Sequence, residues 1–241
     1  MNTMTMSENV QVRAADPTTG FRRAAGAIAL PLGFVCHLVC NVIYAWVSTE
    51  SGLTDTEDLP QAYALYAAYP TPLVVCTFLV IVGGLLLIPG LLTALRIVRP
   101  ARPRLGLTAV VLMLVGYISY LGISFTNFDT VTFATSVPEV ASVVESSPWQ
   151  AAPMPFFVLF LIGNLIGTLL FGLAVVLGGR KVGVPWWAGA LIMCWTLGHI
   201  INIAGGGEWF AVGGGALQIA GCVVLCVRAL RMPQTQWARL G

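Results

Sequence analysis

The sequence predicts an all-α membrane protein, a polytopic bundle of six transmembrane helices with both termini in the cytoplasm. Two observations support this. Of the 241 residues, 57% are hydrophobic and only 9% are charged, whereas a soluble domain has about a quarter of its residues charged. The charged residues are also sorted, because basic and acidic side chains occupy alternate connectors between the apolar segments. The composition excludes a soluble enzyme, and the expected partner is a lipid bilayer and not a nucleic acid.

Six segments are long enough to cross a bilayer, which takes about 20 mainly apolar residues. The first is longer than the apolar stretch of a typical signal peptide, so we expect it to be retained. The transmembrane domain should cover residues 23–231, between a disordered cytoplasmic tail at 1–22 and a cytoplasmic tail at 232–241. The predicted spans are residues 24–48, 71–98, 106–126, 153–177, 186–205 and 211–230.

The orientation follows from the distribution of charge. Every basic residue lies in the N-terminal tail, the second connector, the fourth connector or the C-terminal end. By the positive-inside rule these segments are cytoplasmic, and the protein is a multi-pass protein of the cell membrane. The basic residues are Arg13, Arg22, Arg23, Arg96, Arg99, Arg102, Arg104, Arg180, Lys181, Arg228, Arg231 and Arg239. The acidic residues of the opposite connectors are Glu50, Asp55, Glu57, Asp58, Asp129, Glu139, Glu145 and Glu208.

Two outer connectors carry helix signals. In the third connector, Ser136 stands three residues before Glu139, which is a capping box and predicts a short helix through Ser146. In the first connector, three tyrosines at three-residue spacing predict a helix lying at headgroup level. These tyrosines are Tyr63, Tyr66 and Tyr69.

Polar side chains deep in the spans are the candidates for function, because such residues are costly in lipid and usually face a bundle interior. His37 and His199 each lie thirteen residues into an outward-running span, about 20 Å from the cytoplasmic edge. We therefore expect the two imidazoles at matching depth and close together across the first and fifth helices. Asn41 follows His37 by one turn, and Asn202 follows His199 at three-residue spacing.

The leading functional hypothesis is a polar cavity, open to the outside, that binds or transports a small molecule. Glu208, in the glycine-rich turn after the fifth span, would lie at its mouth. The alternative is a closed bundle in which these groups satisfy one another, as in a non-catalytic membrane subunit or scaffold. The proposed ligand-binding residues are His37, Asn41, Asn164, His199, Asn202 and Glu208.

A further alternative is a redox protein in which His37 and His199 are the two axial ligands of haem b. Cys36 and Cys40 flank His37, but buried cysteines are usually apolar filler, and we predict no metal site. The sequence contains no Ser-His-Asp set, HExxH motif or phosphate-binding glycine loop, so we assign no catalytic residue and expect no enzymatic activity.

The hairpin between the fourth and fifth spans carries the most distinctive motifs. Gly163 and Gly167 form a small-x-x-x-small pair that favours close helix packing. Residues 178–189 add a basic pair and Gly-x-Pro-x-Trp before another glycine-bearing span. This hairpin resembles that of small multi-pass membrane proteins of unknown function common in actinobacteria. The resemblance implies a membrane location and lends no site residues.

Overall fold

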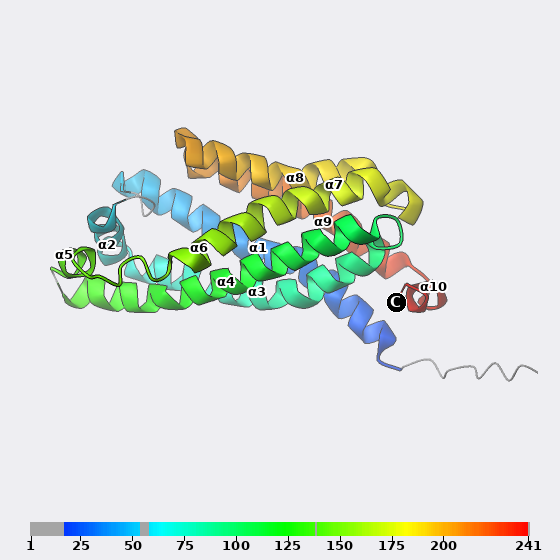
Figure 1. Cartoon of the computed structure of the whole chain (residues 1–241), viewed down its shortest axis with the longest axis horizontal. Helices are drawn as coiled ribbons and strands as arrows, with labels where there is room; N and C mark the ends of the chain where they lie inside the picture. Colours follow the sequence, from blue (N-terminus) through cyan, green and yellow to red (C-terminus); the bar gives the residue numbers. More distant parts are fainter. Residues whose placement is uncertain (1–16, 54–57, 138, 241) are drawn as a thin grey trace, which may run out of the picture.

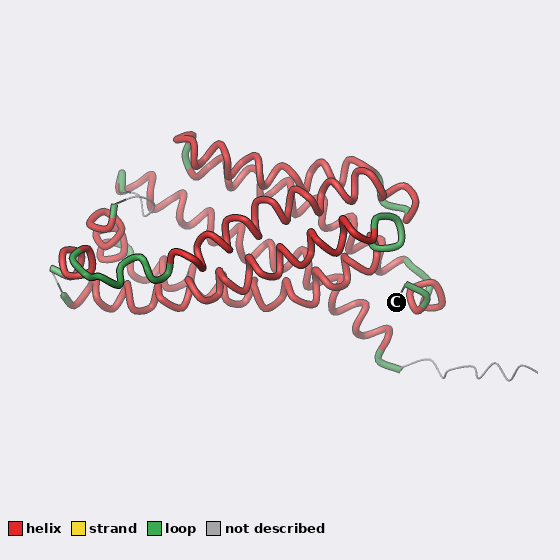
Figure 2. Tube along the Cα trace, viewed as in Figure 1, coloured by secondary structure: helices red, strands yellow, loops and turns green. Residues whose placement is uncertain are grey.

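Six long apolar helices run along the length of the molecule (Figure 1), and in the described part of the chain they are joined by loops and shorter helices (Figure 2). The computed structural model describes residues 17–53, 58–137 and 139–240. The prediction of an all-α bundle with six membrane spans is confirmed. The spans are α1 (Thr19–Ser51); α3 (Pro70–Val98); α4 (Pro103–Ser136); α6 (Met154–Leu161), η1 (Ile162–Ile166), α7 (Gly167–Gly178) and η2 (Gly179–Val182) in series; α8 (Trp186–Ile201) with η3 (Asn202–Gly206); and α9 (Glu208–Arg231).

The spans form a closed ring. Helix α1 packs against α3, α3 against α4, α4 against α6, η1 and α7, α7 against α8, and α8 against α9. Helix α9 then returns to α1 and closes the circle. The interior is filled mainly by apolar side chains from every span, and Tyr117 of α4 lies among them.

Glycines set the distance between α4 and the fourth span. A Cβ atom added to Gly163 would lie 2.6 Å from the Cα of Gly116, so the two backbones touch. One added to Gly167 would lie 2.8 Å from the Cγ of Met113. The predicted small-residue pair therefore faces α4, where dispersion between closely packed backbones stabilises helix association in lipid.

Helix α4 is longer than predicted and changes the third connector. It continues ten residues past the predicted end at 126 because residues 127–136 contain no proline or glycine. Ser136 is consequently the last residue of α4, and the predicted capping box is wrong. The short helix α5 (Val140–Glu145) does form, with Glu139 at its N-cap and no side-chain capping bond. Helix α2 (Leu59–Ala68) occupies the first connector, as predicted from the tyrosine spacing.

The described part of the predicted tail at 232–241, residues 232–240, packs against the bundle. Its helix α10 (Gln234–Ala238) places Trp237 in the core with 1% of its surface exposed. The guanidinium of Arg96 lies over the Trp237 ring at 5.0 Å, and Arg23 of α1 donates a hydrogen bond to the carbonyl of Met232. Residues 1–16 of the predicted N-terminal tail lie outside the described residues, and α1 already begins at Thr19.

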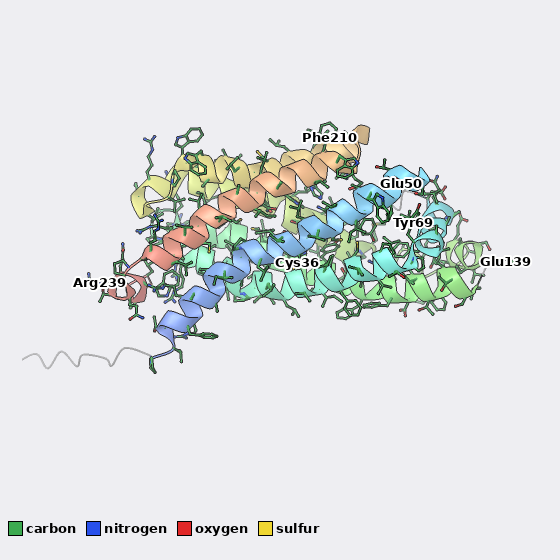
Figure 3. The ribbon with its side chains drawn as sticks, turned by 180° about the vertical axis from the view of Figure 1, so that it is seen from behind. Cys36, Glu50, Tyr69, Glu139, Phe210 and Arg239 are labelled. Carbon is green, nitrogen blue, oxygen red and sulfur yellow. The ribbon has the colours of Figure 1, made fainter. Side chains whose placement is uncertain are left out.

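The two ends of the bundle differ in charge. Figure 3 shows Glu50, Tyr69 and Glu139 at one end and Arg239 at the other. We call these the acidic end and the basic end. The sorting of charge predicted from the sequence is thus present in the fold, whereas which end faces the cytoplasm stays a prediction.

Candidate functional site

Tyr117 lies at the centre of a buried group of polar side chains. Its ring contacts that of His37 on α1 edge to face, with the centroids 5.2 Å apart. Its hydroxyl lies in hydrogen-bonding range of the Asn164 side chain, on η1, and near Cys222 of α9. Thr168 follows Asn164 by four residues and Gln218 precedes Cys222 by four, so both belong to the same interior faces. We call His37, Tyr117, Asn164, Thr168 and Gln218 the Tyr117 cluster.

His37 has one satisfied nitrogen and one unsatisfied nitrogen. Its Nδ1 lies 2.9 Å from the carbonyl oxygen of Gly33, one turn earlier. Because a carbonyl accepts only, Nδ1 carries the hydrogen and Nε2 is left as an acceptor. The ring fits against α3 because residue 83 is glycine: a Cβ there would lie 2.6 Å from Nδ1. The orientation of His37 is therefore fixed by its backbone bond and by packing.

Asn164 is turned into the interior by a π-helical turn. Such turns insert one extra residue into a helix and are frequent at functional sites. Here the hydroxyl of Thr196 on α8 donates to the carbonyl of Leu165 at 3.0 Å, which provides a partner for a carbonyl within the turn. The contact between Gly116 and Gly163 holds the other side of the turn against α4. The turn is thus secured from both neighbouring spans.

Four polar atoms of the Tyr117 cluster are buried without a hydrogen-bond partner. Leaving one such group unsatisfied costs about 1–3 kcal/mol, so four of them are a considerable cost for the interior of one bundle. The atoms of His37 and Asn164 are acceptors, the Thr168 hydroxyl can both donate and accept, and the Gln218 amide nitrogen is a donor. The atoms are His37 Nε2, Asn164 Oδ1, Thr168 Oγ1 and Gln218 Nε2.

The remaining predicted ligand residues lie nearer the acidic end and are half-buried. The His199 ring lies on that of Trp195 with centroids 3.9 Å apart, and its Nδ1 is 3.3 Å from the Trp195 carbonyl oxygen. Asn41, Asn202 and Glu208 are also half-buried, and Glu208 is the first residue of α9. The structure therefore joins His37 and Asn164 through Tyr117, and its described contacts do not link the other four residues to that pair.

A haem held by His37 and His199 needs both rings to face one gap. The rings of His37 and His199 have different neighbours, and neither ring's described contacts include the other. Helix α9 packs against both α1 and α8 and lies between them in Figure 3. These contacts therefore do not support a haem bound by both imidazoles, and that hypothesis stays a prediction. Among the described residues, no group of three or more His, Cys, Asp or Glu side chains is placed to hold a metal ion.

A cavity of about 260 Å³ lies at the acidic end, between α2, the last turn of α4 and α5. Its lining is mostly alanine, valine and proline, together with Tyr63. Partial burial raises the pKa of the Tyr63 phenol, so the hydroxyl is neutral at ordinary pH. This cavity offers apolar surface and is separate from the Tyr117 cluster.

Sequence reasoning did not assign Thr168 or Gln218 to the candidate site. The signal for Thr168 was present, since it follows Asn164 by four residues and so shares its helix face. The π-helical turn has no comparable signature, because it depends on Thr196 of another span.

No protein-family model, curated protein or solved structure matches this chain. The resemblance noted for the hairpin therefore identifies no family. The structure supports a multi-pass membrane protein of six apolar helices, associated with a lipid bilayer, with unsatisfied polar side chains buried in its interior.

Proposed function

We propose that the protein binds a small neutral polar molecule in the Tyr117 cluster. The observation that carries the proposal is the set of four buried polar atoms without partners, drawn from α1, η1, α7 and α9. Buried polar groups in native proteins are nearly always hydrogen-bonded, either within the protein or to water or ligand. A bound solute would satisfy atoms that the protein leaves unsatisfied.

The chemistry of the cluster selects the solute. The cluster contains no Asp, Glu, Lys or Arg, so a charged ligand would be buried without a counterion at high cost. His37 Nε2 and Asn164 Oδ1 both accept hydrogen bonds, which favours a ligand with at least two donors. The rings of Tyr117 and Tyr120 against His37 provide an apolar wall. Neutral hydroxyl or amide compounds with several donors, such as glycerol or urea, meet these requirements.

Access is proposed from the acidic end. Asn41 lies one turn beyond His37 on α1 and is half-buried, and Tyr44 follows within one further turn. These residues form a polar stripe that leads from the cluster toward Glu50. In the orientation predicted by the positive-inside rule, the acidic end faces outward, so the solute would be taken from outside the cell.

Paired threonine variants test the proposal. Thr168 and Thr77 are both buried, but the Thr77 hydroxyl donates to the Leu73 carbonyl oxygen at 3.0 Å, whereas Thr168 Oγ1 has no partner. Melting temperatures in detergent would be measured with increasing glycerol or urea, with an osmotically matched betaine series as the reference. We expect a saturable solute-dependent shift relative to betaine in wild type and Thr77→Val, and its loss in Thr168→Val and Asn164→Leu.

Stability without solute provides the complementary readout. Thr168→Val replaces an unsatisfied hydroxyl by a methyl group of the same shape, so it should leave the solute-free melting temperature unchanged or raise it. If no solute shifts wild type in a saturable way, and Asn164→Leu lowers stability by about 1 kcal/mol as loss of an interhelical bond would, the protein is a closed bundle. A role as a membrane subunit or scaffold would then replace this proposal.

A further inference from the structure

A second cavity lies at the basic end, where α9 and α10 meet the hairpin between α7 and α8. Its volume is about 210 Å³, far above the roughly 15 Å³ that one water molecule needs. It combines cationic, amide and apolar side chains, unlike the mostly apolar cavity at the acidic end. The lining comprises Ile97, Pro100, Lys181, Val182, Arg228, Met232, Gln236 and Leu240.

Arg228 is held in one orientation at the edge of this cavity. Its Nε donates to the carbonyl oxygen of Val182 at 2.6 Å. The guanidinium lies over Gly183, where a Cβ would come within 2.9 Å of Nε and where φ is +75°, so both the turn and the close approach require glycine. Arginine has five N–H donors, and this hydrogen bond uses only one. The remaining N–H donors of the Arg228 guanidinium are available to a ligand, and the guanidinium is already held in place by its bond to Val182.

No carboxylate of the described chain neutralises these cations. Of the twelve basic residues Arg13 lies outside the described residues, and the other eleven lie at the basic end. The described residues of this end include no Asp or Glu. The acidic side chains that could form salt bridges with Arg228 and Lys181 lie at the opposite end of the bundle. A bound anion would therefore meet positive charge that no acidic side chain of the described residues offsets.

The cavity lies at the level of the lipid headgroups. Trp186 and Trp187 begin α8 just after the Lys181 turn, and about half of each side chain is exposed on the surface. Tryptophan is enriched where hydrocarbon meets headgroups, and Arg228 lies in the last turn of α9. Lipid phosphates occupy this depth on both sides of a bilayer.

We propose that this cavity binds the phosphate group of an anionic lipid headgroup, with Arg228 as the fixed anchor and Lys181 as a second cation. The planar guanidinium matches a phosphate with two parallel hydrogen bonds, and lysine adds a compact charge. Gln236 contributes an amide donor, and Ile97, Met232 and Leu240 form a wall for the carbon atoms attached to the phosphate. This site is independent of the Tyr117 cluster and of what that cluster binds.

Lipid retention by the purified protein tests the site. Native mass spectrometry would measure the apparent dissociation constant of phosphatidylglycerol for the full-length protein, with phosphatidylcholine as the neutral reference lipid. Arg228→Gln and Lys181→Gln should each weaken phosphatidylglycerol binding about tenfold, as expected for a lost hydrogen bond to a charged group. Arg104→Gln removes the same charge from an exposed position of the basic end outside the cavity, and should change binding by no more than about twofold.

Three outcomes would overturn the proposal. Equal losses in all three variants would mean that lipid is held by the overall charge of the basic end. Unchanged binding in Lys181→Gln and in Arg228→Gln would exclude recognition by these two side chains. Since Lys181 is exposed, its variant does not depend on the hairpin folding normally. Displacement of phosphatidylglycerol by equimolar inorganic phosphate would assign the cavity to the free ion. Retention of the lipid in excess phosphate is the supporting result.

Discussion

Buried threonines in this protein show how position decides the energetic role of a side chain. Thr77, Thr168 and Thr196 are all almost fully buried, yet one donates within its own helix, one donates to another span and one has no partner. The depth of His37 and Asn164 could be predicted from the cost of polar groups in lipid. The sequence could not predict which polar atoms stay without a hydrogen-bond partner. Whether a hydroxyl reaches a carbonyl oxygen depends on local packing and not on residue type.

At this scale, the contact between Gly163 and Gly116 gives a direct prediction. Gly163→Ala places a Cβ 2.6 Å from the Cα and backbone nitrogen of Gly116, so α4 and η1 must separate. We expect a loss of about 1–3 kcal/mol in unfolding free energy, as for overpacking in other cores, measured by reversible unfolding in mixed micelles. The control is Gly122→Ala on the exposed face of α4, where a Cβ meets nothing within 4 Å. Equal stability of the two variants would show that the helices do not touch there.

Among the elements, the fourth span is the most irregular, with a π-helical turn between α6 and α7. Hydropathy predicted this span within a few residues, because a window of apolar residues measures length across the bilayer. It could not predict the turn, which depends on Thr196 and Gly116 in two other spans. Hydropathy also placed the end of α4 too early, at 126, because it measures only the apolar part of a helix. A helix that leaves the membrane continues until a helix-breaking residue ends it.

The turn should loosen when its interhelical bond is removed. Thr196→Val deletes the donor to the Leu165 carbonyl, at a cost of about 0.6 kcal/mol, the average for such bonds in membrane bundles. Amide hydrogen exchange should rise across residues 162–170 and remain unchanged in α3. Thr132→Val, whose hydroxyl donates only to Phe128 of its own helix on an exposed face, is the matched control. Faster exchange confined to α8 would contradict the assigned role of Thr196.

For the whole molecule, the sorting of charge between the two ends is the feature most fully anticipated by the sequence. The six spans and their order followed from apolar length, and helix α2 followed from the spacing of its tyrosines. The sequence could not predict that α9 packs against α1 or that Trp237 enters the core. Contacts between residues far apart in the chain produce no periodic pattern in a sequence.

Single-cysteine labelling tests the orientation. The six native cysteines are free thiols and lie in the spans, so they can be replaced before new ones are introduced. Asp58→Cys, Glu145→Cys and Glu208→Cys should react with an impermeant maleimide added outside intact cells. Arg102→Cys and Lys181→Cys should react only after the membrane is opened. Labelling of Arg102→Cys in intact cells would reverse the orientation and place the polar stripe of α1 toward the cytoplasm.

The closure of the ring by α9 has a consequence for biosynthesis. Spans leave the ribosome in order, so the face of α1 that will hold Leu38 against Gly215 stays uncovered until the sixth span arrives. A nascent chain with five spans lacks α9, and with it Cys222, which lies near Tyr117. Trp237, which follows the sixth span in the sequence, then packs beneath Arg96. Assembly of the bundle is thereby coupled to synthesis of its sixth span.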